Sequence, residues 1–166
     1  MSQTSINKSG QPIAFAGQRS DNSDGLNIVS RFSGESSTRI GFGLGLKQGT
    51  NDHEVKLPAA STDVVQGVSV HGYHHMPGEF GDLDQASTPP GLKPKAGLQI
   101  MRRGRIWVAV DAGVTSIAAG IDRAYCRAVA SGANTLVGAF TNAADGGNTI
   151  DIRKQSVFVG SIRTAA

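Results

Sequence analysis

The chain has 166 residues with 22 glycines, 39% hydrophobic and 17% charged residues, and a formal net charge of +3. Disordered chains combine high charge with few β-branched residues, so this composition excludes an extended disordered protein and favours short strands joined by many turns. The positive charge is mild and mostly dispersed, which argues against nucleic-acid binding.

Cysteine content and the apolar runs point to synthesis in the cytoplasm. Cys126 is the single cysteine, so an internal disulfide is excluded. The first residues contain no apolar run of the kind found in secretory signals. No stretch approaches the 18 or so apolar residues of a membrane span, so we expect no membrane association.

Residues 1–35 are predicted to form an N-terminal arm with short strands. They are rich in serine, glycine and asparagine, and two apolar runs, PIAFA at 12–16 and LNIVSRF at 26–32, interrupt them. We expect this arm to pack on another subunit, which makes the apolar residues of the two runs candidate partner contacts. These are Ile13, Phe15, Ile28 and Phe32.

From residue 39 onward, apolar residues alternate with others in a regular way. Residues 39–46 (RIGFGLGL) have period 2 and predict one strand, whose glycine face would let another backbone come close. A turn at 49–52 and a short strand at 54–57 follow, and residues 64–71 (VVQGVSVH) alternate again.

Residues 72–94 hold four of the six prolines and show no sustained periodicity, so they predict a long surface loop. Residues 97–110 then predict the strongest strand signal in the chain. Either one long strand with a bulge at Gly104 or a tight hairpin fits this pattern.

The remaining segments also indicate strands, at 122–130, 135–140, 149–152 and 157–162. A helix over 115–124 is the one helical candidate, and Gly120 weakens it. We therefore predict an all-β domain at 36–166, a sandwich or barrel of about ten short, mainly antiparallel strands.

The clearest cluster of possible metal ligands is His71, His74 and His75, followed by acidic residues. It matches no zinc signature, and most of it falls in the predicted loop, so we expect no metal, cofactor or catalytic site. Cys126 lies on the same alternating face as Ala124, Ala128 and Ala130, which indicates packed core rather than a nucleophile.

Three arginines beside a tryptophan form the best candidate for a partner-binding surface. They are Arg102, Arg103 and Arg105, and Trp107 follows them. Arginine and tryptophan are enriched in interface hot spots. The alternative interpretation, a solvated strand face with Trp107 in the core, has equal weight.

The order of several motifs resembles that of bacteriophage structural cement proteins, which decorate capsids. Residues 49–60 (GTNDHEVKLPAA) look like that family's turn and "V-K-L-P" strand, and residues 65–71 look like the strand that follows. Residues 102–108 (RRGRIWV) are similar to its "R-x-G-x-x-W/Y-V" strand, and residues 136–149 to its "L-G-x-F … D-G-G" ending.

The resemblance implies a non-enzymatic protein on the outer surface of the virion capsid, made in the host cytoplasm. It implies a homotrimer that binds the major capsid protein and bridges capsomers against the pressure of packaged DNA, without a cofactor. The alternative is a tail-associated or carbohydrate-binding β-module. Such modules use aromatic platforms, whereas this chain has one tryptophan and two tyrosines.

Overall fold

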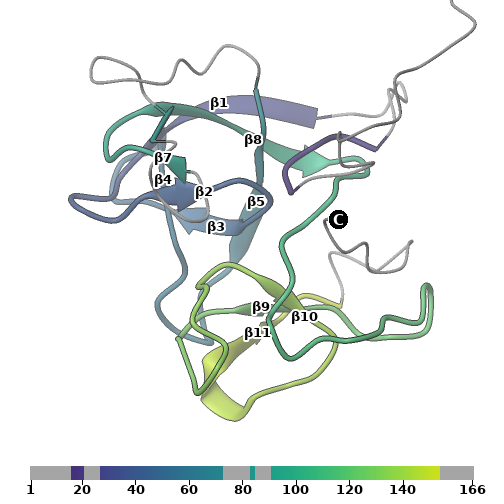
Figure 1. Ribbon diagram of the computed structural model, residues 1–166. Helices are drawn as coiled ribbons and strands as arrows, with labels where there is room; N and C mark the ends of the chain where they lie inside the picture. The colour runs from purple at the N-terminus through teal and green to yellow at the C-terminus, as the bar shows by residue number, and fades with distance from the viewer. Residues whose placement is uncertain (1–15, 21–26, 73–82, 85–90, 154–166) are drawn as a thin grey trace, which may run out of the picture.

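The computed structural model describes residues 16–20, 27–72, 83–84 and 91–153. These residues form strands β1 to β11 and one short 3₁₀ helix, η1 (Gly146–Asn148), which confirms the all-β prediction. In Figure 1 the purple-to-teal strands lie above a separate green-to-yellow sheet. Within the described ranges, no helix is long and apolar enough to cross a membrane.

Five strands close into a barrel in the order β1-β4-β3-β5-β8. They are β1 (Asn27–Ser33), β3 (Gly45–Gln48), β4 (Glu54–Lys56), β5 (Val65–Val70) and β8 (Gly97–Arg103). β1 runs parallel to β4, and the other neighbouring pairs in the barrel are antiparallel. Because a closed barrel has no free strand edges, it avoids edge-to-edge aggregation.

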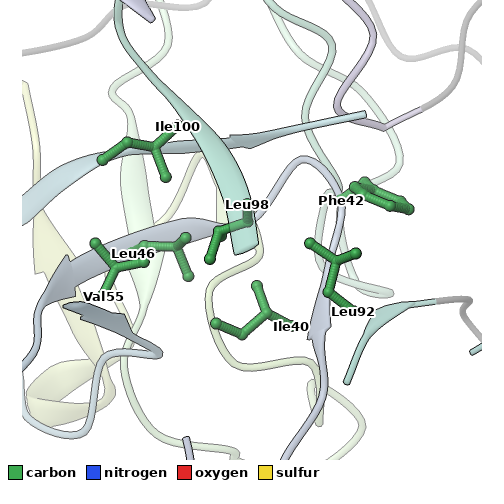
Figure 2. Close-up of a cluster of buried hydrophobic side chains, with 7 residues drawn as sticks. All are labelled: Ile40, Phe42, Leu46, Val55, Leu92, Leu98 and Ile100. Atoms are coloured by element: carbon green, nitrogen blue, oxygen red, sulfur yellow. The ribbon is translucent and has the colours of Figure 1, made fainter. Parts of the chain in front are cut away.

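The barrel core consists of aliphatic side chains and one phenylalanine, drawn together in Figure 2. They are Ile40, Phe42, Leu46, Val55, Leu92, Leu98 and Ile100. On β8, Leu98 and Ile100 are buried and Gln99 between them is only half-buried, as the period-2 pattern predicts. Burial of each such side chain contributes roughly 1.5–3 kcal/mol.

Residues 39–46 form two strands in different sheets, so the prediction of one strand is wrong. β2 (Ile40–Gly41) ends at a turn, and β3 begins at Gly45. Gly43 in that turn has φ +70°, a left-handed conformation that breaks the alternation. The alternating pattern was correct about burial but could not show where the chain turns.

The segment predicted as one long loop at 72–94 contains two short strands. β6 (Leu83–Asp84) and β7 (Gly91–Leu92) form a three-stranded sheet with β2, in the order β2-β7-β6. This sheet brings Leu92 into the barrel core.

The strong signal over residues 97–110 also resolves differently from either prediction. β8 ends at Arg103, and Gly104 follows with φ +131°. Beyond it, Ile106 and Val110 form only isolated bridges, to Arg19 and Phe140 respectively. The chain therefore leaves the barrel at Gly104 and runs towards the sheet that contains β10, and it forms neither a bulged strand nor a hairpin.

A separate three-stranded sheet has the order β10-β9-β11, and we call it the second sheet. β9 (Tyr125–Arg127) is flanked by β10 (Phe140–Thr141) and β11 (Thr149–Asp151), both antiparallel to it. Of residues 122–130, which were predicted as a strand, residues 125–127 form one, and the helix alternative at 115–124 is wrong. Ala130, expected on the core face, is exposed because the strand ends at Arg127.

Glycines let the second sheet pack closely on the barrel. A Cβ at Gly45 of β3 would lie 2.6 Å from the Cys126 Sγ atom of β9. The Gly45 amide donates to the Gly138 carbonyl at 2.8 Å, and Gly138 itself has φ +87°. The predicted role of the glycine face in residues 39–46, close approach by another backbone, is realised at this junction.

Part of the predicted N-terminal arm pairs with the same chain. β1 lies in the barrel, although its residues fall within the range 1–35 assigned to the arm. Residues 17–20 run beside residues 105–107, where Gly17 and Gln18 exchange backbone hydrogen bonds with Trp107. The first 15 residues and the expected strand at 157–162 lie outside the described residues.

Candidate functional site

The end of β8 and the segment beside it place four arginines at one end of the barrel, and we call these the arginine edge. They are Arg19, Arg102, Arg103 and Arg105, and all four are exposed. Arg103 lies opposite Asn27 of β1 in the antiparallel ladder. Arg19 forms a bridge with Ile106, and the Ser20 amide donates to the Arg105 carbonyl at 3.1 Å.

The geometry of the arginine edge depends on Gly104. Its φ of +131° suits glycine alone, and it turns the chain immediately after Arg102 and Arg103. Arg105 then lies on the far side of this turn, next to residues 17–20. Arg19 is the member that sequence reasoning missed, because only the backbone pairing of 17–20 with 105–107 brings it there.

Trp107 is neither fully in the core nor on the surface, and its side chain is half-buried. Its backbone is held on both sides, since its amide donates to the Gln18 carbonyl at 2.9 Å and its carbonyl accepts from Gly17 at 2.7 Å. The two interpretations of Trp107 therefore each describe part of its surroundings.

The predicted apolar partner contacts are spread along the β1–β8 ladder. Ile28 is half-buried and pairs with Met101, next to the arginine edge. Phe32 is 58% exposed and pairs with Gly97 at the other end, about 17 Å from the Asn27 position. Ile13 and Phe15 lie outside the described residues.

The histidine cluster is only partly placed. The half-buried His71 packs against Phe42, with ring centroids 4.6 Å apart in an edge-on arrangement. His74 and His75 lie outside the described residues. In the placed part of the chain, no group of three histidine, cysteine, aspartate or glutamate side chains is arranged to hold a metal ion.

The structure also contains a buried ion-pair array that sequence reasoning missed. The Arg127 side chain is 1% exposed, and its Nε and Nη1 atoms each lie 2.7 Å from a carboxylate oxygen, of Asp111 and Asp145 respectively. The alternation over residues 122–130 puts Arg127 on the face opposite Cys126, and nothing in the sequence connects it with Asp111 or Asp145. An arginine within an alanine-rich strand was the available signal.

Burial and hydrogen bonding have opposite effects on the charged state of Arg127. Burial by itself would lower the pKa of the Arg127 guanidinium, but hydrogen bonds to Asp145 and Asp111 outweigh burial and raise that pKa. The hydrogen bond from Arg127 likewise holds the pKa of Asp145 below its ordinary value. Arg127 and Asp145 are thus held in their charged forms, which suits a structural role better than proton transfer.

Cys126 is buried in the core, as its alternation predicted. This core lies between the second sheet and the barrel, because Val65 and Val68 of β5 pack against it. Burial, with a further contribution from the charge of Asp111, raises the pKa of the Cys126 thiol to about 12. Because the thiolate is the reactive form, this side chain is a poor nucleophile at neutral pH.

Comparison with known proteins identifies one family. Residues 2–166, nearly the whole chain, match the family model described as "Structural cement protein (E217 gp24/Pam3 gp6)". No curated protein matches the chain.

Proposed function

The chain belongs to the bacteriophage structural cement protein family, and from this premise we propose that it binds the outer surface of the phage capsid and reinforces it without catalysis. The family match over residues 2–166 carries this proposal. The all-β architecture, with its ion-pair array around the buried Arg127 and its unreactive thiol, agrees with a structural role.

We propose that the protein reinforces the capsid because it binds the assembled shell and not the separated capsomers. Packaged DNA pushes outward and strains the seams between capsomers of the major capsid protein. A protein that binds the intact lattice but not its separated parts stabilises the lattice by mass action. The stabilisation is about 4 kcal/mol per site at a thousandfold excess over Kd.

The arginine edge is the surface that we propose for contact with the major capsid protein. It gathers exposed guanidinium groups from two segments of the chain, and each can bind a carboxylate through two parallel hydrogen bonds. Half-buried Ile28 and Trp107 lie beside these arginines and would add apolar contact at the same end of the barrel. Ile13, Phe15 and the exposed Phe32 belong to the N-terminal arm, and we propose that they contact another subunit.

We further propose that the protein acts as a homotrimer. Three linked copies of one binding surface gain affinity through effective concentration once the first copy has bound. This gain lets a modest surface such as the arginine edge hold the protein on the shell.

Co-sedimentation with capsids that lack the protein tests the role of the arginine edge. We expect Arg102→Glu combined with Arg103→Glu to weaken capsid binding at least about tenfold, because reversed charges would face the carboxylates of the capsid. Wild-type binding should weaken as salt is added, since exposed charges are screened.

Lys95→Glu provides the matched control. Lys95 is an exposed cation that precedes β8, at the opposite end from Arg103. Its reversal should leave binding within about twofold of wild type if the arginine edge makes the contact. Equal loss in both variants would point to general charge attraction, and failure of the wild-type protein to sediment with capsids would refute the proposed function itself.

A further inference from the structure

Residues 16–20 form a short segment that is bound to the barrel on one side and to the chain leaving β8 on the other, and we call it the strap (Figure 1, dark purple). Its Gly17 amide donates to the Trp107 carbonyl at 2.7 Å, and the Trp107 amide donates to the Gln18 carbonyl at 2.9 Å. On the barrel side, the amide of His71, the residue after β5, donates to the Gly17 carbonyl at 2.9 Å. The strap therefore ties the residues beyond β8 to the barrel.

Gly17 is the point at which the strap fits against the barrel. It is buried, and its φ of +83° is a conformation that other residues rarely adopt. A Cβ at this position would lie 2.8 Å from the Phe42 Cβ atom and 2.9 Å from the His71 backbone nitrogen. The facing turn is equally tight, since a Cβ at Gly43 would lie 2.7 Å from the Gly17 nitrogen. Any side chain at position 17 would therefore force the strap and the barrel apart.

The barrel closes without the strap, but the chain beyond β8 depends on it. The five barrel strands pair among themselves, whereas residues 104–110 belong to none of the strands β1 to β11. Three backbone hydrogen bonds join this segment to the strap, two at Trp107 and one from the Ser20 amide to the Arg105 carbonyl. Release of the strap would thus free residues 105–107 while the barrel stays folded, as in local unfolding of a weakly held segment.

The arginine edge is assembled from parts that differ in what holds them. Arg102 and Arg103 end β8 and are fixed by the barrel. Arg105 lies in the segment that the strap holds, and Arg19 belongs to the strap itself. Because like charges repel, the backbone hydrogen bonds of the strap have to keep these cations together. Groups that are already in place lose less conformational entropy when they bind a partner.

We infer that Gly17 is a positioning residue of the arginine edge, because through the strap it holds Arg19 and Arg105 beside Arg102 and Arg103. One glycine thereby decides whether four ordered cations or two face a partner. The consequence of this arrangement for capsid binding rests on the proposed function, in which the arginine edge contacts the major capsid protein.

Gly17→Ala in the full chain tests the inference, because its Cβ would meet the barrel and its backbone conformation disfavours alanine. We expect the strap to detach and the amides of His71 and Trp107 to exchange hydrogen at least about tenfold faster by NMR, while the amides of the β1–β8 ladder keep their protection. Trp107 is the single tryptophan, so its emission should move to longer wavelength as its half-buried ring meets more water.

Gly120→Ala is the matched control. Gly120 has φ +74°, so alanine meets the same backbone cost there, but no atom lies within 4 Å of the Cβ position. Exchange at His71 and Trp107 and the tryptophan emission should match wild type. Wild-type behaviour of Gly17→Ala, or the same change in both variants, would overturn the inference.

Ser20→Pro replaces Gly17→Ala if the alanine variant does not fold. Proline has no amide hydrogen, so it removes the bond from Ser20 to the Arg105 carbonyl at an exposed position without adding atoms to the buried contact at Gly17. It should give the faster exchange and the emission shift at Trp107. Wild-type values for both measurements would count against the inference in the same way.

Capsid co-sedimentation measures what the strap contributes to the arginine edge. Gly17→Ala should weaken binding at least about fivefold. It should add no further loss to Arg19→Gln combined with Arg105→Gln, because the cations that it positions are then already removed. It should add its full loss to Arg102→Gln combined with Arg103→Gln. A general defect of folding would add its loss in both backgrounds, and that result would overturn the positioning role.

The two sets of measurements separate this inference from the proposed function. If exchange and emission change as expected but the wild-type protein does not bind capsids, the positioning role of Gly17 stands and the capsid function fails. If the wild-type protein binds capsids but Gly17→Ala and Ser20→Pro leave exchange, emission and binding unchanged, the capsid function stands and the inference fails.

Discussion

Ser69 shows how one buried polar group organises the turn between β2 and β3. Its hydroxyl donates to the Gly41 carbonyl at 2.7 Å and accepts from the Leu44 amide at 2.9 Å. The Ser69 side chain is fully buried. Without it, backbone groups on both sides of the turn would lose their partners away from water.

Ser69→Ala is therefore expected to lower the free energy of unfolding by about 1–3 kcal/mol, the cost of leaving buried polar groups unsatisfied. Urea denaturation followed by circular dichroism measures this loss. Ser36→Ala removes an exposed hydroxyl and serves as the control, with little change expected. Equal stability of the two variants would mean that the Ser69 hydroxyl does not hold the turn.

At the scale of elements, the ion-pair array connects three segments of the second sheet. Asp111 lies where the chain arrives from the barrel, Arg127 belongs to β9, and Asp145 precedes η1 and β11. The Asp111 amide also donates to the Phe140 carbonyl of β10 at 2.9 Å. The array thus fixes the entry of the chain relative to the strands of the second sheet.

Asp111→Ala should lower the free energy of unfolding by about 3–5 kcal/mol, because it leaves the buried Arg127 without one of its carboxylates. Chemical denaturation of the purified protein measures the change. Asp151→Asn removes an exposed carboxylate that pairs with the exposed Arg153, and it should have a much smaller effect. Similar losses in both variants would argue against a structural role for the buried array.

At the scale of the whole molecule, ionised carboxylates that accept hydrogen bonds make the stability of the fold depend on pH. A hydrogen bond from Arg153 lowers the pKa of Asp151 to about 2. Hydrogen bonds also lower the pKa of Asp63 (from the Ala59 amide), Asp122 (from Asn142) and Asp145 (from Arg127). A folded-state pKa below the unfolded value stabilises the fold above the unfolded pKa, and this stabilisation is lost as pH falls through the folded pKa.

We therefore expect the Tm to be nearly constant from pH 7 to pH 5 and to fall between about pH 4 and pH 2, since unfolded aspartate titrates near 3.9. Thermal unfolding across this pH series is the measurement. Asp145→Asn should be less stable at pH 7 and should lose less on acidification than wild type. A Tm that does not change between pH 5 and pH 2 would contradict the assignment of these shifts.

The strands that the sequence predicted best are those with clean alternation and a turn signal at each end. Residues 54–57 and 64–71 became β4 and β5, and residues 97–103 became β8. The predictions were weakest where glycine allowed the chain to turn within an apparently continuous pattern, at Gly43 and Gly104. Alternation reports which side of the chain is buried, and it does so on both sides of such a turn.

For the candidate surface, the sequence identified Arg102, Arg103 and Arg105 but not Arg19. Arg19 joins the others through backbone pairing with a segment far along the chain.

The sequence by itself determined the all-β class, the main strands and the core position of Cys126, because strand periodicity and turn chemistry act between residues close along the chain. The tertiary structure alone decided the closure of the barrel, the parallel pairing of β1 with β4 and the burial of Arg127. Arg127 meets its carboxylates across separations of 16 and 18 residues, so the free energy that keeps its charge buried arises only when distant segments are brought together.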